Sequence, residues 1–415
     1  MIKQNAPSPA NPGLPDSLWP IFLIFLRLGC TAFGGPIAHL GYLRREFVEK
    51  RRWLSEDRFA GIVSLCQFLP GPASSQVVFA IGNIRAGLLA GLVASAAFLL
   101  PSAVLMIGFG MSLSTVAVTQ VDIKWLIDAL KLVAVPFVAQ AVYGMFRSLC
   151  PDAHRRILCV IIGAINLFFP TTLVQILSIL VASGWGVIWS SWGVASTFSL
   201  TETNNKPDRN RDLIAAALLI VFFLLLMVSL ASYDRGNAWL NSFNIFYGSG
   251  ALVFGGGHVV LPLLRSQLVP SGLISDDLFL SGYGAAQALP GPLFAFAGFI
   301  GSIVFANSFP LLGGLWCLAA IFLPAWLIIG GALPFWDRLS ASQKTRASVA
   351  GANVAVVGVL LAAFVNPVCF ESLHASLHQP RDIAFAIPAF IALEKGKVPP
   401  IAVVATLVGI SWLIH

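Results

Sequence analysis

Charged side chains are scarce in this chain. Only 10% of its 415 residues are Asp, Glu, Lys or Arg, whereas 57% are hydrophobic. Soluble globular domains carry about 25% charged residues, which cover the surface that water wets. A soluble fold of this length is therefore excluded, and the composition predicts helices that lie in lipid.

Signatures of disulfide, metal and nucleotide chemistry are also missing. The six cysteines form no CxxC pair, and five lie in or at the ends of apolar stretches, so we expect small buried residues rather than disulfides or metal ligands. No GxxxxGK[ST] motif is present, so no P-loop ATPase is expected in this chain, and no cofactor is expected. The net charge of +7 comes from loops between apolar segments, which excludes nucleic acid as the expected partner.

Long apolar runs fill most of the chain. A helix needs about 20 apolar residues to cross a bilayer, and its backbone must pair within its own segment. The runs predict an all-α polytopic membrane protein with about 10–13 membrane segments, some of them broken. The predicted segments lie at 19–35, 59–82, 86–112, 125–146, 157–169, 172–190, 213–232, 239–257, 279–305, 311–335, 346–365, 382–394 and 399–414.

The chain contains an internal duplication. At an offset of 220 residues, eight of the 18 positions in 55–72 are identical to those in 275–292, including all of Leu-Pro-Gly-Pro. At an offset of 221, Phe-Gly-Gly at 33–35 matches 254–256, and at an offset of 223, 91–101 matches 314–324 at six of 11 positions. Because the matches are collinear, two homologous halves are predicted.

A polar stretch at 201–212 marks the join between the halves. The apolar run from Leu213 to Ser232 has no counterpart in the first half, so we expect an extra connecting helix. The N-terminus has four prolines and no apolar core, which predicts a disordered tail rather than a signal peptide. The predicted domains are the tail at 1–18, a first transporter repeat at 19–190, the linker and connecting helix at 191–238, and a second repeat at 239–415.

Loop charges predict opposite orientations for the two halves. Six Lys or Arg lie from Arg44 to Arg58, whereas the equivalent stretch 265–278 contains only Arg265. The excess moves to the second half in the next pair of loops and returns to the first half in the third pair. Cytoplasmic loops carry the Lys/Arg excess. The alternation indicates an inverted repeat, which is common among secondary transporters, and it leaves 239–257 as a broken or re-entrant segment.

The two Leu-Pro-Gly-Pro motifs lie inside apolar segments, where they must break the helix. A break at membrane depth is tolerated only inside protein or beside water, and the half-helix that follows attracts anions at its N-terminus. A structural kink is the alternative, but the duplication favours a substrate site. The predicted site residues are Gln67, Pro70, Gly71, Pro72, Ser74, Ser75 and Gln76 in the first half and Gln287, Pro290, Gly291 and Pro292 in the second.

Glycines and arginines flank these breaks. The Phe-Gly-Gly glycines either pack helices closely or open the backbone for the substrate. Arg44 and Arg265 are repeat-related, and they either clamp an oxyanion or mark topology. The glycines included in the predicted site are Gly34, Gly35, Gly255 and Gly256.

Four further ionisable residues lie in or near the apolar segments. His39 and His258 are either proton carriers or structural hydrogen-bond donors. Arg27 and Lys131 sit within apolar runs, where charges usually face the protein interior, so either is a candidate anion ligand. Lys131 alternatively reaches the interface or pairs with Asp128, three residues before it.

The segment FGGPIAHLGYLRREFVEKRRWLSEDRFAGIVSLCQFLPGP at 33–72, followed by Ile81-Gly82 and Arg85-Ala86-Gly87, resembles the chromate ion transporter family. FGGGHVVLPLL at 254–264 and QALPGP at 287–292 are similar to that family's second domain. The resemblance implies a long-chain, two-domain member in the inner membrane. Its implied activity is chromate efflux, driven by the membrane potential or the proton gradient, which confers chromate resistance.

Chromate is a tetrahedral dianion close in shape to sulfate, so a site of half-helix ends, hydroxyls and arginines would hold either. Chromate export and sulfate exchange or import by the same fold therefore both stay open. A membrane enzyme is the remote alternative, because the sequence shows no clustered catalytic set. The expected partners are the transported anion and membrane lipid, with a homodimer as one arrangement.

Overall fold

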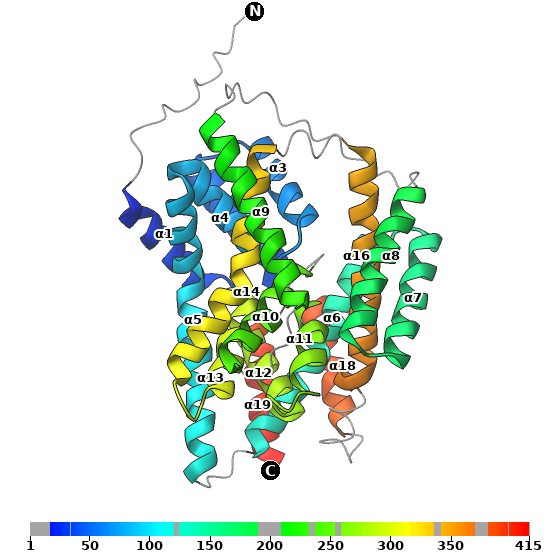
Figure 1. Ribbon diagram of the computed structural model, residues 1–415. Helices are drawn as coiled ribbons and strands as arrows, with labels where there is room; N and C mark the ends of the chain where they lie inside the picture. The colour runs from blue at the N-terminus through cyan, green and yellow to red at the C-terminus, as the bar shows by residue number, and fades with distance from the viewer. Residues whose placement is uncertain are drawn as a thin grey trace, which may run out of the picture.

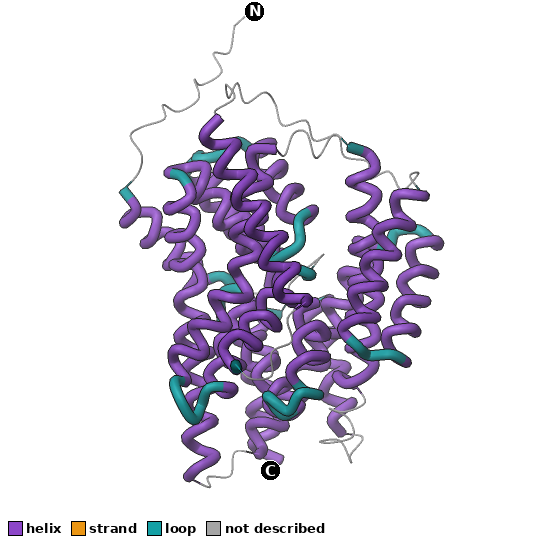
Figure 2. Tube along the Cα trace, in the orientation of Figure 1, coloured by secondary structure: helices purple, strands orange, loops and turns teal. Residues whose placement is uncertain are grey.

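The computed structural model describes residues 17–33, 35–119, 124–189, 209–231, 237–253, 259–335, 342–369, 381–396 and 398–414. These residues form helices joined by loops, and no strand occurs among them (Figure 2). The all-α prediction is therefore confirmed for this part of the chain. Gly34, Gly255, Gly256 and His258 lie outside the described residues, as do most of the predicted tail and linker.

The first half begins with short helices and continues with longer ones. Each short helix of this half has 10 to 14 residues, and at 1.5 Å per residue such a helix is shorter than the roughly 30 Å of a bilayer core. The elements are α1 (Leu18–Thr31), α2 (Gly35–Arg44), η1 (Arg45–Lys50), α3 (Glu56–Phe68), α4 (Ala73–Ala86), α5 (Leu88–Thr119), α6 (Lys124–Leu149), α7 (Ala153–Phe168) and α8 (Thr172–Ile188).

The second half repeats this order after a single long helix, α9 (Arg209–Ala231), which is mostly exposed along its length. Its early helices are again short, and its later ones are longer. The elements are α10 (Ala238–Ala251), α11 (Val260–Leu268), α12 (Asp276–Ala288), η3 (Leu293–Ala295), α13 (Phe296–Val304), α14 (Pro310–Ala332), η4 (Leu333–Phe335), α16 (Gln343–Ala363), η5 (Phe364–Cys369), α18 (Arg381–Glu394) and α19 (Pro400–Ile414).

Five described helices are long and apolar enough to cross a membrane. These spans lie at Leu88–Ser114, Trp125–Leu149, Arg209–Ala231, Pro310–Phe335 and Arg346–Asn366. Shorter apolar helices accompany them at Leu18–Thr31, Leu173–Ile188, Leu293–Val304, Ala384–Glu394 and Pro400–Leu413. The composition of these helices agrees with a membrane protein, because apolar side chains remain on their outer faces where lipid would lie.

The halves are interleaved rather than packed as separate bodies. In each half one long helix, α5 or α14, packs along the short helices, and α5 also packs against α13 of the other half. The later helices are exchanged, because α7 and α8 of the first half pack on α16, whereas α18 and α19 of the second half pack on α6 (Figure 1). Each half therefore contributes to the hydrophobic core of the other.

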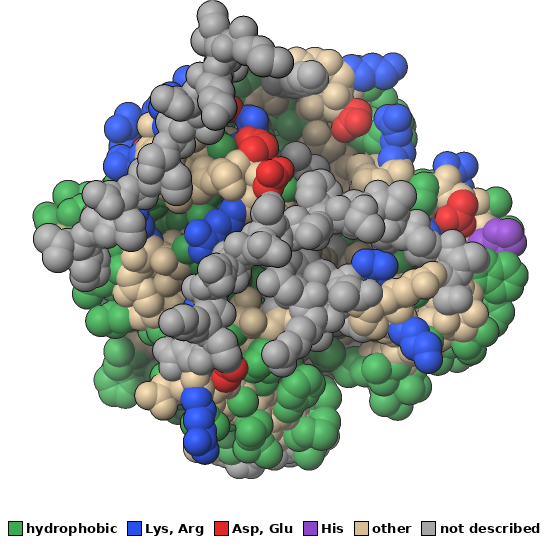
Figure 3. All heavy atoms as spheres, turned by 90° about the horizontal axis from the view of Figure 1, so that it is seen from above, with side chains coloured by type: hydrophobic (Ala, Val, Ile, Leu, Met, Phe, Trp, Pro, Cys, Tyr) green, Lys and Arg blue, Asp and Glu red, His purple; other side chains and the backbone are tan. Residues whose placement is uncertain are grey.

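The short helices of the two halves lie toward opposite ends of the molecule. In Figure 1, α3 and α4 lie near the top, whereas α12 and α13 lie lower down. Seen from the end where α3 and α9 begin, Lys and Arg side chains are spread around the face (Figure 3). This end includes the Lys/Arg-rich stretch that the sequence assigns to the cytoplasm.

Candidate functional site

Both Leu-Pro-Gly-Pro motifs interrupt a helix. α3 ends at Phe68 and α4 begins at Ala73, whereas α12 ends at Ala288 and η3 begins at Leu293. Gly71 has a φ of 122° and Gly291 a φ of 105°, which side chains with a Cβ rarely adopt. The motif therefore breaks the helix in two ways. Proline lacks the backbone N–H that a helical hydrogen bond needs, and glycine takes a positive φ that a helix does not have.

Two reciprocal hydrogen bonds connect the helix break of each half to the opposite half. The Gly71 N–H donates to the Val253 carbonyl at 2.6 Å, and the Gly291 N–H donates to the Ala32 carbonyl at 2.9 Å. Ala32 and Val253 are equivalent at the 221-residue offset, and each directly precedes a Phe-Gly-Gly sequence. The structure thus brings each Leu-Pro-Gly-Pro motif to the edge of the Phe-Gly-Gly motif of the opposite half.

The two glycines also fit against equivalent helices of the opposite half. A Cβ on Gly71 would lie 3.3 Å from the Cβ of Ala325 in α14, and a Cβ on Gly291 would lie 2.7 Å from the Oγ of Ser102 in α5. Ser102 and Ala325 correspond at the 223-residue offset, each following a helix proline. No side chain fits at either glycine without movement of a neighbour, so the break points are packed against protein rather than exposed.

The first turn of α4 is polar and buried at this junction. Ser74, Ser75 and Gln76 are each at most 4% exposed. Pro72 provides no side-chain cap for this helix, whereas Ser55 caps α3 by accepting from the Arg58 N–H. An uncapped N-terminus leaves backbone N–H groups and the positive end of the helix dipole for another acceptor.

Several buried polar atoms near the breaks have no hydrogen-bond partner among the described residues. Ser75 Oγ and Gln76 Oε1 are two such atoms, whereas the Gln287 amide lies beside the Tyr283 hydroxyl. Gln76 Nε2 instead donates to the Pro70 carbonyl at 2.7 Å and so holds the break in shape. Gln67, one turn before the first break, is exposed. The second half has Phe294, Ala295 and Phe296 where the first has Ser74, Ser75 and Gln76, so hydroxyl donors are concentrated in the first half.

His39 lies directly beside the second break. Its Nε2 is 3.0 Å from the Ala32 carbonyl, which also accepts from Gly291. A carbonyl only accepts, so Nε2 carries the proton in this contact. The Nδ1 atom is buried without a described partner, and the ring edge meets Phe98. In this structure His39 donates a hydrogen bond beside the break, and its role as a proton carrier stays a hypothesis.

The repeat-related arginines are both engaged by carboxylates. Arg44 contacts Glu56 and Glu49, each at 2.6 Å. Arg265 makes a two-pronged contact with Asp276 at 2.7 and 3.0 Å. Glu56 and Asp276 are equivalent at the 220-residue offset, so the same ion pair is built twice, at the start of α3 and of α12. The sequence analysis did not predict these ion pairs, although an acidic residue at the same position of both halves, Glu56 and Asp276, could have indicated them.

The two remaining charges have different surroundings. Arg27, which we expected in the protein interior, is exposed on α1, because it falls on the helix face opposite the buried Ile21, Phe25 and Leu28. Lys131 is buried, as expected of a charge at membrane depth.

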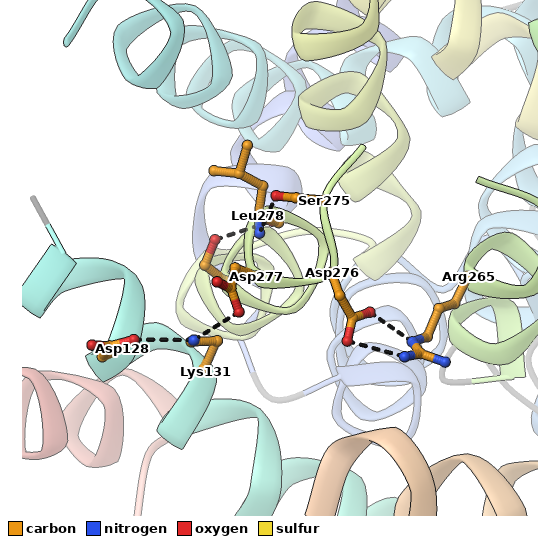
Figure 4. Close-up of polar contacts among 8 residues, drawn as sticks. Asp128, Lys131, Arg265, Ser275, Asp276, Asp277 and Leu278 are labelled. Atoms are coloured by element: carbon orange, nitrogen blue, oxygen red, sulfur yellow. Dashed lines mark hydrogen bonds and ion pairs between the residues drawn. The ribbon is translucent and has the colours of Figure 1, made fainter. Parts of the chain in front are cut away.

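Lys131 lies between two carboxylates (Figure 4). Its Nζ is 3.0 Å from Asp128 on the same helix and 2.9 Å from Asp277 on α12. The pairing with Asp128 was a sequence alternative and is present. The contact with Asp277, 146 residues away, had no sequence signal because it depends on which helix packs against α6.

Comparison with known proteins covers both halves. A sequence model of the family described as chromate transporter matches residues 19–188 and 240–412. The chromate transport protein of Pseudomonas aeruginosa is 27% identical over 96% of this chain and 93% of the relative. A probable chromate transport protein of Synechococcus elongatus is 27% identical over 94% of each chain, and the chromate transport protein of Cupriavidus metallidurans is 24% identical over 83% of this chain and 81% of the relative.

No solved structure matches the chain significantly. The family match covers well over half of the sequence and extends across both halves of the chain and most of the apolar helices. The chain is therefore a multi-pass membrane protein that belongs to the chromate transporter family.

Proposed function

We propose that this protein is a secondary transporter that exports chromate across the inner membrane and so confers chromate resistance. The observation that carries the proposal is the meeting of two helix breaks from opposite halves, with an uncapped helix N-terminus and unpartnered polar atoms at the junction. Two relatives that match over most of their length are named chromate transport proteins, which supports the choice of substrate.

The proposed site replaces the hydration shell of a tetrahedral dianion with fixed donors. The first-turn N–H groups of α4 point away from their own helix and carry its positive dipole end. The Ser75 hydroxyl from the first half supplies a donor that no described group satisfies, and the Gln287 amide from the second half lies beside the Tyr283 hydroxyl. Gln76 acts as a positioning residue, because its amide holds the Pro70 carbonyl away from the anion.

The proposed anion site does not include the two repeat-related arginines in this conformation. Arg44 and Arg265 are each held by a carboxylate, so they would reach an oxyanion only after those contacts open. Hydrogen bonds to a charged group contribute about 1.5–3 kcal/mol each, so a few N–H and O–H donors suffice for binding without a nearby guanidinium. Weak, reversible binding suits a carrier that must also release its substrate.

We further propose that the two repeats are inverted, with a pseudo-two-fold axis in the membrane plane. The reciprocal glycine hydrogen bonds, the duplicated Arg–carboxylate pairs and the exchanged packing of α7 and α8 with α18 and α19 support this arrangement. The placement of α3 and α12 toward opposite ends in Figure 1 supports it as well. In this arrangement the short helices α1–α4 and α10–α13 form hairpins that enter the membrane and return.

Transport by everted membrane vesicles tests the proposal. Vesicles that contain the protein should accumulate labelled chromate when a proton gradient is imposed, and an uncoupler should stop accumulation while ATP is maintained. Vesicles with the Ser75→Ala variant should need a higher chromate concentration for the same rate. Accumulation that continues after the uncoupler is added, and that depends on ATP, would instead indicate a partner ATPase.

Sulfate transport by the same site is the second candidate function. The donors described above recognise charge and tetrahedral shape, which chromate and sulfate share. Excess unlabelled sulfate in the vesicle assay distinguishes the two functions. Unchanged chromate uptake supports a chromate exporter, whereas strong competition together with uptake of labelled sulfate supports a general oxyanion exchanger or importer.

A further inference from the structure

The two ends of the molecule are built from repeat-related parts but are packed differently. α12 packs along α6, and a Cβ on Gly284 would overlap the Leu130 carbonyl of α6. Asp277, Ser281 and Gly284 form the stripe of α12 that faces α6, because they are spaced at i, i+4 and i+7. We call this contact the α6–α12 seam. Ser281 is fully buried in it.

The equivalent contact at the other end is open. α3 corresponds to α12 and α16 to α6, yet among the described residues α3 packs mainly against α4 and makes no comparable contact with α16. Gln67 in α3 is exposed, whereas its mate Gln287 is half-buried. Ser64, the mate of Gly284, is half-buried as well. Among the described residues, the α12 end is thus closed by packing on α6, whereas α3 has no such packing on α16; we call these the closed end and the open end.

In the part of the chain that the structure describes, only the closed end carries an ionic contact across its seam. Lys131 of α6 is 3% exposed and reaches Asp277 of α12 at 2.9 Å, with Asp128 on its other side (Figure 4). The sequence Val-Ala-Val at 133–135 recurs at 354–356, which aligns Lys131 with Ala352. The other end therefore retains the acid, Asp57, but has no lysine at the equivalent position to face it.

We propose that Lys131 and Asp277 form a lock that holds the α12 end of the transporter closed, and that transport exchanges the α6–α12 seam for an equivalent α3–α16 seam without a lock. Lys131 is the buried partner of this contact, whereas the Asp277 side chain is 60% exposed, so loss of Asp277 leaves the buried lysine with Asp128 as its one carboxylate among the described residues. The lock also replaces the hypothesis that Lys131 holds the anion, because two carboxylates already compensate this lysine. The role of this contact in transport rests on the proposed transport function.

Cysteine accessibility at both ends tests the lock. In a full-length background without the six natural cysteines, Ser281→Cys reports the α6–α12 seam and Ser64→Cys reports the open end. The purified protein is labelled with a bulky maleimide, and the two rates are measured separately. Labelling requires no substrate, so its outcome is independent of whether chromate is the transported ion.

Lys131→Met keeps the aliphatic stem and removes the charge. We expect it to raise the labelling rate at Ser281→Cys about tenfold, the factor that corresponds to about 1.4 kcal/mol, and to lower the rate at Ser64→Cys. Asp277→Asn should act in the same direction. The exchanged pair Lys131→Asp with Asp277→Lys rebuilds two carboxylates around one lysine and should return both rates toward their starting values. Lys50→Met, at an exposed lysine of η1, is the control that should change neither.

Two results would overturn the proposal. Unchanged labelling at Ser281→Cys in both Lys131→Met and Asp277→Asn would show that the contact does not hold the seam. A rise at both Ser281→Cys and Ser64→Cys would show general loosening of the fold instead of an exchange between two closed ends.

Discussion

Gly291→Ala is the sharpest perturbation of the junction between the halves. At a φ of 105° an alanine is strained by about 1–2 kcal/mol. Its Cβ would also lie 2.7 Å from Ser102 Oγ, which is too close for either atom to stay in place. Ser102 Oγ is held by the Leu99 carbonyl at 3.0 Å, so turning it away costs about 1 kcal/mol more. The expected loss of stability is therefore about 2–3 kcal/mol.

Gly87→Ala separates the free-energy cost of backbone strain from the cost of steric overlap. Gly87 has a φ of 84°, but a Cβ there would meet nothing within 4 Å, so only the strain of about 1–2 kcal/mol is expected. Thermal unfolding of the purified proteins should rank wild type above Gly87→Ala and Gly87→Ala above Gly291→Ala. In vesicles, Gly87→Ala should transport normally, whereas Gly291→Ala should transport poorly because the shift weakens the bond from Gly291 to Ala32.

Ser102→Ala provides the second test of the same reasoning. It removes the hydroxyl that the new Cβ of the Gly291→Ala variant would meet first. It should therefore recover about 1 kcal/mol in the double variant, while having little effect alone. Equal melting temperatures for Gly291→Ala and Gly87→Ala, combined with no coupling to Ser102→Ala, would refute the close packing of this break against α5.

Three further predictions follow from individual contacts. Ser75→Ala should raise the KM for chromate about tenfold without lowering the yield of folded protein, because an unpartnered buried hydroxyl is lost from the site; an unchanged KM in initial-rate measurements would remove Ser75 from it. His39→Gln should keep both transport and its pH profile, since an amide can still donate to Ala32, and a flattened profile would instead identify His39 as a proton carrier. Arg265→Gln should destabilise the protein by about 1–3 kcal/mol, because Asp276 loses a two-pronged partner in a partly buried place, and Arg44→Gln should have a smaller effect at its exposed position; equal melting temperatures for the two variants would contradict this difference.

The sequence by itself determined the class of protein, the long apolar helices and the positions of the breaks, whereas α2, η1 and α11 fell outside the predicted segments. These features are local. Apolar composition decides whether a segment partitions into lipid, and the Pro-Gly-Pro backbone cannot continue a helix whatever surrounds it. The pairing of Asp128 with Lys131 was also within reach, because residues three apart share a helix face.

Tertiary structure alone decided which distant groups meet. Nothing in the sequence indicates that Gly71 donates to Val253, that Asp277 reaches Lys131, or that Arg27 faces outward. Such contacts depend on how helices rotate and pack against one another, and packing is a property of many side chains acting together. The duplication predicts two similar ends, but only packing decides that one seam is closed and the other open, since equivalent segments can adopt different neighbours in one conformation.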